Sequence, residues 1–300
     1  MSASPAVSRT TWRSRLGLYA RLVRLDKPIG ILLLLWPTLW AVFAAAGGLP
    51  PLSILIIFSL GTALMRSAGC AMNDYFDRDV DIHVQRTEHR VLTTGQIAPR
   101  EALLVAAVLA LVSLALIVPL NTLTHGLAVV AAFLAITYPL MKRFFAIPQA
   151  YLGIAFGFGI PMGFAALQDT IPLAAWVMLL ANICWAIAYD TEYAMVDRDD
   201  DLRLGLKTSA ITFGRLDIFW VAVFYALTIG LLWFAGSLLG YGWPYWAGLV
   251  VAAGIAVQHI FWIRHRDRAA CFKAFLHNTW FGCSVFAGIL VQTMLVGARA

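Results

Sequence analysis

Two short windows of the chain concentrate its carboxylates. Of the 16 Asp and Glu residues, ten lie in residues 74–81 and 190–201. Both windows begin where a long apolar run ends, a position where a carboxylate is costly unless it serves a cation. The tripeptide Asp-Arg-Asp occurs in each window, at 77–79 and 197–199. Gathered carboxylates repel one another, so the pattern predicts a site for a hard divalent cation.

The spacing inside each window suits one face of a helix. Asp74, Asp77 and Asp81 are separated by three and four residues, so they share a face if the apolar helix continues through the window. Steps of seven and four residues give the same result for the second window, in Asp190, Asp197 and Asp201. We therefore expect two helices to present these carboxylates to one cavity. A solvated acidic loop is the alternative interpretation.

The sequence favours magnesium over a softer metal. Mg²⁺ prefers oxygen ligands and commonly shares its coordination shell with a substrate phosphate. The six His residues are scattered, and the four Cys residues show no metal-ligand spacing. A diphosphate substrate that reaches such a site from lipid would carry a long apolar tail. If diphosphate leaves an allylic carbon, the resulting cation can be stabilised by aromatic rings.

Three basic residues are candidates for binding an anion beside the metal. Arg66 lies inside an apolar run, seven residues before Asn73, where an isolated cation is expensive. We expect it to contact either a bound anion or a cavity carboxylate. Lys142 and Arg143 end a later apolar run and are either anion ligands or side chains that anchor the helix at the membrane interface.

The elements that must position these residues are membrane helices. Hydrophobic residues make up 61% of the 300-residue chain and charged residues 13%, and about 20 apolar residues span a bilayer. The sequence predicts an all-α, polytopic protein with nine transmembrane helices around a central cavity open to the cytoplasmic side. We place the spans at residues 28–47, 52–73, 103–120, 123–141, 147–167, 171–189, 218–238, 243–263 and 272–296.

The distribution of basic residues predicts the orientation. Of the 22 Lys and Arg residues, 20 fall in the N-terminal segment and in alternate connections between the spans. The positive-inside rule then makes the N-terminus and both acidic windows cytoplasmic. We expect residues 1–25 to form a basic tail and residues 26–297 a single domain. The membrane is expected to be the bacterial inner membrane, with the mitochondrial inner membrane as the alternative. The basic charge reflects topology and lipid contact, not nucleic-acid binding.

The motifs closely resemble those of the UbiA-type family of intramembrane aromatic prenyltransferases. Asn-Asp-Tyr-Phe-Asp-Arg-Asp-Val-Asp at 73–81 resembles the first motif of the family, and Asp-Arg-Asp-Asp-Asp at 197–201 resembles the second. Asp-Lys-Pro-Ile-Gly at 26–30 and Gly-Leu-Lys-Thr-Ser-Ala-Ile-Thr-Phe-Gly at 205–214 resemble its 4-hydroxybenzoate polyprenyltransferase branch. The resemblance runs from about residue 20 to 290.

The resemblance implies specific roles for the candidate residues. By it, Mg²⁺ and the diphosphate of a polyprenyl donor bind at Asp77, Asp81, Asp197 and Asp201. Asn73 and Asp74 would support the first motif, and Asp190 belongs to the run that contains the second. Arg66 and Lys142 would bind the diphosphate, and Arg143 would pair with the carboxylate of the acceptor.

The activity implied by the resemblance is transfer of a polyprenyl group to the ring carbon ortho to the hydroxyl of 4-hydroxybenzoate, in ubiquinone biosynthesis. A prenyltransferase with another aromatic acceptor is an alternative within the same class. A cation-coupled transporter is the alternative from another class, because intramembrane carboxylates also bind transported ions. Against the transporter, the acids gather near one face and not at the midplane, and the connections on the other face carry only Asp169.

Overall fold

The computed structural model describes residues 12–141 and 145–297, and these residues form helices and no strands. The helices are α1 (Trp12–Leu22), α2 (Ile29–Ala46), α3 (Leu52–Asp81), α4 (Pro99–Ile117), α5 (Thr122–Met141), α6 (Pro148–Gly157), α7 (Gly159–Gln168), α8 (Leu173–Leu204), α9 (Ser209–Phe213), the 3₁₀ turn η1 (Gly214–Leu216), α10 (Asp217–Leu238), α11 (Trp243–Ile263) and α12 (Arg268–Gly297).

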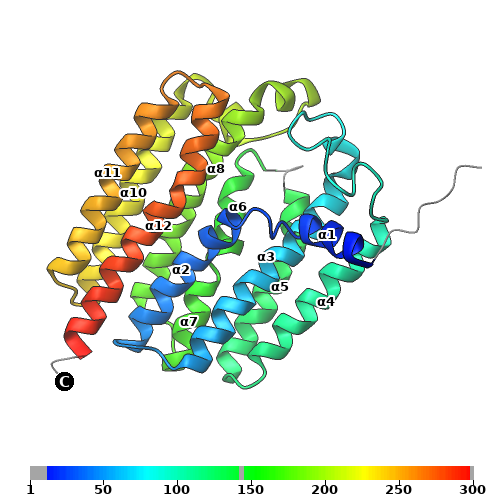
Figure 1. Cartoon of the computed structure of the whole chain (residues 1–300). Helices are drawn as coiled ribbons and strands as arrows, with labels where there is room; N and C mark the ends of the chain where they lie inside the picture. Colours follow the sequence, from blue (N-terminus) through cyan, green and yellow to red (C-terminus); the bar gives the residue numbers. More distant parts are fainter. Residues whose placement is uncertain (1–11, 142–144, 298–300) are drawn as a thin grey trace, which may run out of the picture.

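The predicted nine spans are confirmed. Nine segments of the described residues are long and apolar enough to cross a membrane, with α6 and α7 together forming the fifth. Two spans run past their predicted ends, since α3 continues from residue 73 to Asp81 and α8 from residue 189 to Leu204. The chain is a polytopic, all-α membrane protein. Figure 1 shows the ends of α3 and α8 at the same end of the bundle, opposite the C-terminus.

The fifth span is broken by proline chemistry. Pro161 has no N–H to donate to the carbonyl of Gly157, four residues earlier, so the helical ladder is interrupted there. The structure ends α6 at Gly157 and restarts at Gly159. An ideal Cβ at Gly159 would lie 2.5 Å from Thr38 Oγ1. Glycine at this break therefore lets α7 approach α2 closely.

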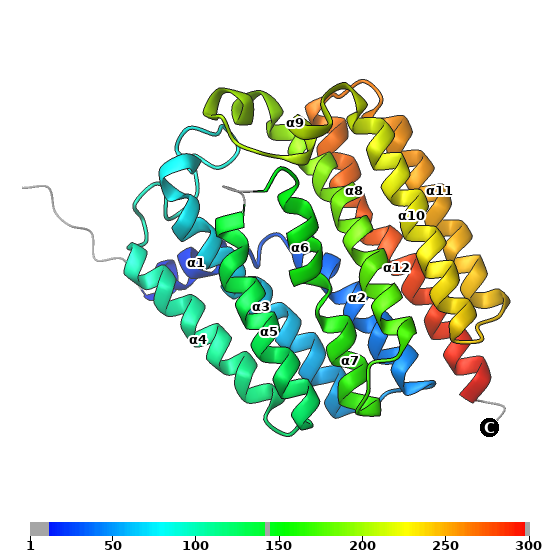
Figure 2. The ribbon, with the colours of Figure 1, turned by 180° about the vertical axis from the view of Figure 1, so that it is seen from behind.

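The hydrophobic core lies around α8, which packs against α6, α10 and α12. Trp40, Trp185 and Phe281 are fully buried there, with ring centroids 5.3 to 5.4 Å apart for the pairs that include Trp185. Figure 2 shows α8, α10, α11 and α12 as one closely packed group, with α3, α4 and α5 on the other side of the molecule.

A buried polar network fixes the rotation of α8 within this group. Glu192 is fully buried and accepts hydrogen bonds from Tyr225 Oη of α10 at 3.0 Å and Asn278 Nδ2 of α12 at 2.8 Å. His259 of α11 lies 2.9 Å from Tyr225 Oη. Because every helix of the group contributes a partner, the network holds α8 with Glu192 turned toward its neighbours and away from the cavity described below.

The segment expected to be a basic tail contains an ordered helix. Residues Trp12–Leu22 form α1, which lies beside the ends of α3 and α4 in Figure 1. Leu18 and Leu22 are buried against Ala71 of α3 and the connection between α3 and α4. The side chains of Arg15 and Tyr19 contact Glu101 of α4. The N-terminal segment is therefore part of the packed structure from Trp12 onward.

Candidate active site

Both acidic windows are helical, as their spacing predicted. The first occupies the end of α3, and the second occupies the end of α8, which stops at Gly205. Gly205 has a φ of 66°, a left-handed conformation that glycine adopts without steric cost. The two helix ends lie across a cavity of about 1160 Å³. The carboxyl-bearing ends of two helices far apart in sequence therefore face one space.

Most of the candidate residues from the sequence line this cavity. The lining includes Arg66, Asn73, Asp77, Asp81, Asp190, Asp197 and Asp201. Asp81, Asp197 and Asp201 are buried, with 5 to 8% of their surface exposed. Asp74 is also buried, with 2% of its surface exposed, but it does not line the cavity. Lys142 and Arg143 lie outside the described residues.

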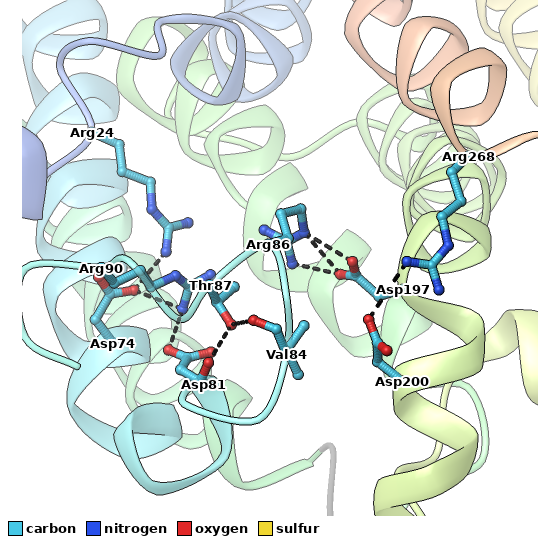
Figure 3. Close-up of polar contacts among 10 residues, drawn as sticks. All are labelled: Arg24, Asp74, Asp81, Val84, Arg86, Thr87, Arg90, Asp197, Asp200 and Arg268. Carbon is cyan, nitrogen blue, oxygen red and sulfur yellow. Dashed lines mark hydrogen bonds and ion pairs between the residues drawn. The ribbon is translucent and has the colours of Figure 1, made fainter. Parts of the chain in front are cut away.

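Arginines from the connection between α3 and α4 pair with one carboxylate of each motif. Arg86 donates to both oxygens of Asp197, with distances of 2.6 to 3.1 Å. Arg90 Nη1 lies 2.5 Å from Asp81 Oδ2. Figure 3 shows both arginines between the two helix ends, with Arg86 directed toward Asp197 and Arg90 toward Asp81. A single connection thus supplies a counter-ion to each motif.

The Arg86 guanidinium has a second partner in an aromatic ring. Its Cζ lies 4.5 Å from the ring centroid of Tyr193, and Tyr193 packs on Phe275 with centroids 4.4 Å apart. Burial disfavours the charged form, but Tyr193 and Asp197 outweigh burial and keep the pKa of Arg86 above its usual value. Arg86 therefore stays cationic at the polar end of the cavity.

Arg66 lies deeper in the cavity wall, on α3. Its guanidinium contacts Cys70 Sγ and lies against Gly30 of α2, where an ideal Cβ would be 2.6 Å from Nη2. Among the described residues, its buried Nε has no hydrogen-bond partner. No ion pair between Arg66 and a cavity carboxylate is found within the described residues, and contact between Arg66 and a bound anion stays a prediction.

Sequence reasoning did not single out three arginines that line the cavity: Arg24, Arg86 and Arg90. They were counted only as residues that set the membrane orientation. Arg86 and Arg90 lie four residues apart and shortly after the first motif, so their proximity to that motif was a usable signal. Arg24 offered no such signal, because it precedes the first span and reaches the cavity only through folding of α1.

The other end of the cavity is apolar and reaches the outer surface between α4 and α5. These helices follow one another in the chain but scarcely touch, since α4 packs on α3 while α5 packs on α6 and α7. Leu111 and Leu114 of α4 line the cavity and yet are 64% and 55% exposed. On the facing side of α5, four alanines line the cavity, Ala128, Ala131, Ala132 and Ala135, and Tyr138 and Pro139 follow them.

The candidate metal ligands at the polar end of the cavity suit a hard cation. Its candidate ligands are carboxylate oxygens and the Asn73 amide, which are the ligand types that Mg²⁺ prefers. Among the described residues, no three His, Cys, Asp or Glu side chains come together as a complete metal site. A cation here would therefore need additional oxygen ligands, such as those of water or a phosphate group.

Comparison with known proteins agrees with this arrangement. The sequence pattern of the UbiA prenyltransferase family matches residues 34–282. The chain is 69% identical over 282 residues to a protein of Cupriavidus metallidurans named 4-hydroxybenzoate octaprenyltransferase, covering 94% of this chain and 96% of that protein.

Two solved structures show the same fold. The apo structure of a UbiA homolog from Aeropyrum pernix K1 has a TM-score of 0.77 and 24% identity, and covers 87% of this chain and 97% of that one. A UbiA homolog from Archaeoglobus fulgidus, bound to GPP and Mg²⁺, has a TM-score of 0.64 and 22% identity over 91% of this chain and 99% of that one. With the family pattern, the high identity to the Cupriavidus protein and the shared fold, this chain belongs to the UbiA prenyltransferase family.

Proposed function

We propose that this protein transfers a polyprenyl group from a polyprenyl diphosphate to 4-hydroxybenzoate. The new C–C bond forms at the ring carbon ortho to the hydroxyl, the allylic C–O bond breaks, and diphosphate and the ring proton leave. The carrying observation is one cavity that joins two acidic helix ends and several arginines to an apolar channel. The 69% identity to a 4-hydroxybenzoate octaprenyltransferase over most of the chain supports this choice of acceptor.

The polar end suits the diphosphate of the donor. Asp77 and Asp81 on α3, with Asp197 and Asp201 on α8, would hold Mg²⁺, and Arg66 lies on the same cavity wall. When bound, Mg²⁺ would neutralise the negative charge that develops on the leaving diphosphate. The arginines add positive charge at that end, and Arg can bind phosphate oxygens through two parallel hydrogen bonds.

The apolar part of the cavity suits the donor tail. It passes between α4 and α5, where Leu111 and Leu114 are both cavity-lining and exposed. A polyprenyl chain lying there would bury apolar surface on the alanine face of α5 and continue into lipid. We infer that this opening lets long donors bind without a closed pocket of matching length.

Aromatic rings also line the cavity. Tyr138, Tyr189, Tyr193 and Phe275 line the cavity, and an aromatic face stabilises a nearby cation. These rings would therefore favour the allylic carbocation over its diphosphate precursor. The electron-donating hydroxyl of 4-hydroxybenzoate makes the ortho carbon the nucleophile, and water or a cavity carboxylate would take the ring proton. Arg143 remains our proposed partner for the acceptor carboxylate.

The proposed function also implies a membrane and an orientation for the protein. Residues 26–297 would act as one domain in the bacterial inner membrane, with the N-terminus and the acidic helix ends on the cytoplasmic side. The basic residues of the connections near these helix ends support this orientation. There the active site would meet a water-soluble aromatic acid from the cytoplasm and a prenyl donor from the bilayer.

A product assay tests the function. Purified protein with Mg²⁺, 4-hydroxybenzoate and a series of prenyl diphosphates should yield prenylated 4-hydroxybenzoate, identified by mass and by the position of the new substituent. Prenylation of another aromatic acid in preference to 4-hydroxybenzoate would assign the protein to a sister activity. Failure to bind a non-hydrolysable prenyl thiodiphosphate in the presence of Mg²⁺ would exclude a prenyltransferase altogether.

A further inference from the structure

Arg24 has an unusual backbone conformation for its residue type. It follows the end of α1 with a φ of 57°, in the left-handed region where glycine is the usual residue after a helix. A residue with a Cβ carries a steric cost in that conformation. Contacts made by the Arg24 side chain, which glycine lacks, would compensate for this cost.

The side chain of Arg24 reaches a carboxylate that it shares with a second arginine. Arg24 Nη2 lies 2.5 Å from Asp74 Oδ1, and Arg90 Nη1 lies 3.0 Å from the same oxygen. Asp74 is almost fully buried, with 3% of its side-chain surface exposed, against 22% for Arg24 and 15% for Arg90. Figure 3 shows the two guanidinium groups converging on Asp74 from different segments of the chain.

The three residues differ in their relation to the cavity. Arg24 and Arg90 both line it, whereas Asp74 does not. On α3, Asp74 is only about 20° from Asp81 around an ideal helix, but the two guanidinium groups that bind its carboxylate line the cavity and cover it on that side. The Asp74 carboxylate therefore does not line the cavity, whereas the two arginine side chains that it binds do.

We propose that Asp74 is a positioning residue that holds Arg24 and Arg90 at the polar end of the cavity, where they receive the diphosphate of the donor. This rests on the proposed function. Arg90 also pairs with Asp81 on the cavity wall. The buried carboxylate of Asp74 lies between the two guanidinium groups and reduces their mutual repulsion. It also ties α1 and the connection between α3 and α4 to α3 at one point, so both cations have a fixed place before substrate arrives.

The first test replaces the carboxylate and keeps its shape. Asp74→Asn should weaken equilibrium binding of farnesyl thiodiphosphate, measured with saturating Mg²⁺, by about tenfold, since each tenfold is 1.4 kcal/mol. The KM for 4-hydroxybenzoate should change less than twofold. Glu101→Gln is the matched control. Glu101 also holds α1, through Arg15 and Tyr19, but it does not line the cavity, so donor binding should stay within twofold of the unaltered protein.

A second variant removes the possibility that lost folding explains the result. Arg24→Gly suits the left-handed backbone, and Arg90 still pairs with the buried Asp74. Thermal stability in detergent should therefore stay close to that of the unaltered protein, while donor binding should fall as in Asp74→Asn. The double variant Asp74→Asn with Arg24→Gly should lose less donor affinity than the product of the two single losses. Both changes act through the same cation, Arg24, so the second change has little left to remove.

Three results would overturn the proposal. Unchanged donor affinity in Asp74→Asn or in Arg24→Gly would show that these cations do not receive the diphosphate. Normal donor binding in Asp74→Asn at a raised Mg²⁺ requirement would make Asp74 a metal ligand instead. Fully multiplicative losses in the double variant would show that Asp74 acts independently of Arg24. If the unaltered protein fails to bind the probe, the proposed function fails, and this inference fails with it.

Discussion

The contact between Gly30 and Arg66 offers a sharp test of the cavity's anion site. An ideal Cβ at Gly30 would lie 2.6 Å from Arg66 Nη2 and 2.9 Å from Nε, closer than van der Waals contact allows. Gly30 is in α2, whose backbone packs on α3, α7 and α12. Because the guanidinium is the end of a flexible side chain, we expect Gly30→Ala to displace Arg66 and not the helix.

We expect Gly30→Ala to weaken binding of the prenyl donor more than it changes the free energy of unfolding. Alanine gains roughly 0.5–1 kcal/mol over glycine within a helix, which offsets part of the cost of moving Arg66, so stability should change by less than about 1 kcal/mol. A hydrogen bond to a charged group contributes about 1.5–3 kcal/mol. If Arg66 binds diphosphate, affinity for farnesyl thiodiphosphate should therefore fall at least tenfold at 1.4 kcal/mol per tenfold.

Gly69→Ala is the matched control for this experiment. Gly69 lines the same cavity, but a Cβ there would meet no atom within 4 Å. Donor affinity, measured by equilibrium binding with Mg²⁺, should remain close to that of the unaltered protein, and so should thermal unfolding in detergent. Equal losses in both variants would mean that any added methyl group obstructs the cavity. Normal binding in Gly30→Ala would refute a role for Arg66 at the diphosphate.

Four further outcomes are expected. Exhaustive chelation should abolish product formation and Mg²⁺ alone should restore it; full turnover in chelator would contradict the metal assignment. Asp77→Ala and Asp197→Ala should each lower kcat more than tenfold, or about 1.4 kcal/mol of barrier, and a smaller effect would remove that residue from the proposed ligands. Ala131→Phe should slow long-chain donors more than geranyl diphosphate, whereas Val129→Phe, at a position 72% exposed and outside the cavity, should slow neither. Glu192→Ala removes the buried carboxylate that accepts from Tyr225 Oη and Asn278 Nδ2 and should lower the unfolding free energy by about 1–3 kcal/mol, with donor KM unchanged; a changed KM would mean that the network acts on the site.

The membrane architecture was predictable because its cause is local. A run of about 20 apolar residues can satisfy its backbone in a bilayer only as a helix, so composition alone located the nine spans. The break between α6 and α7 has a local cause in Pro161, but prolines are tolerated in membrane helices, and Pro37 lies inside an unbroken α2. Helix α1 was missed because only packing of Leu18 and Leu22 on the bundle distinguishes it from a basic tail.

The candidate site was predictable in its acids and not in its cations. Asp77, Asp81, Asp197 and Asp201 follow a helical spacing that continues from an apolar helix, and all four line the cavity. Asp74 fits the same spacing by sequence and lies only about 20° from Asp81 around an ideal helix, yet it does not line the cavity, because Arg24 and Arg90 bind its carboxylate and line the cavity in its place. Only the segments packed against α3 decide which of the carboxylates on this face reaches the cavity.

The arginine pairs also change what removal of a site carboxylate should do. Repulsion among the acids, taken alone, predicts that losing one would not reduce stability. In the structure Asp197 accepts both hydrogen bonds of the Arg86 fork and is 8% exposed. Removing it leaves a largely buried guanidinium without its counter-ion, which is costly. The basic connection that contributes to the predicted membrane orientation thus also compensates the buried acids. We therefore expect Asp197→Ala to lose stability as well as turnover, and Asp197→Asn, which keeps an acceptor for Arg86, to lose mainly turnover.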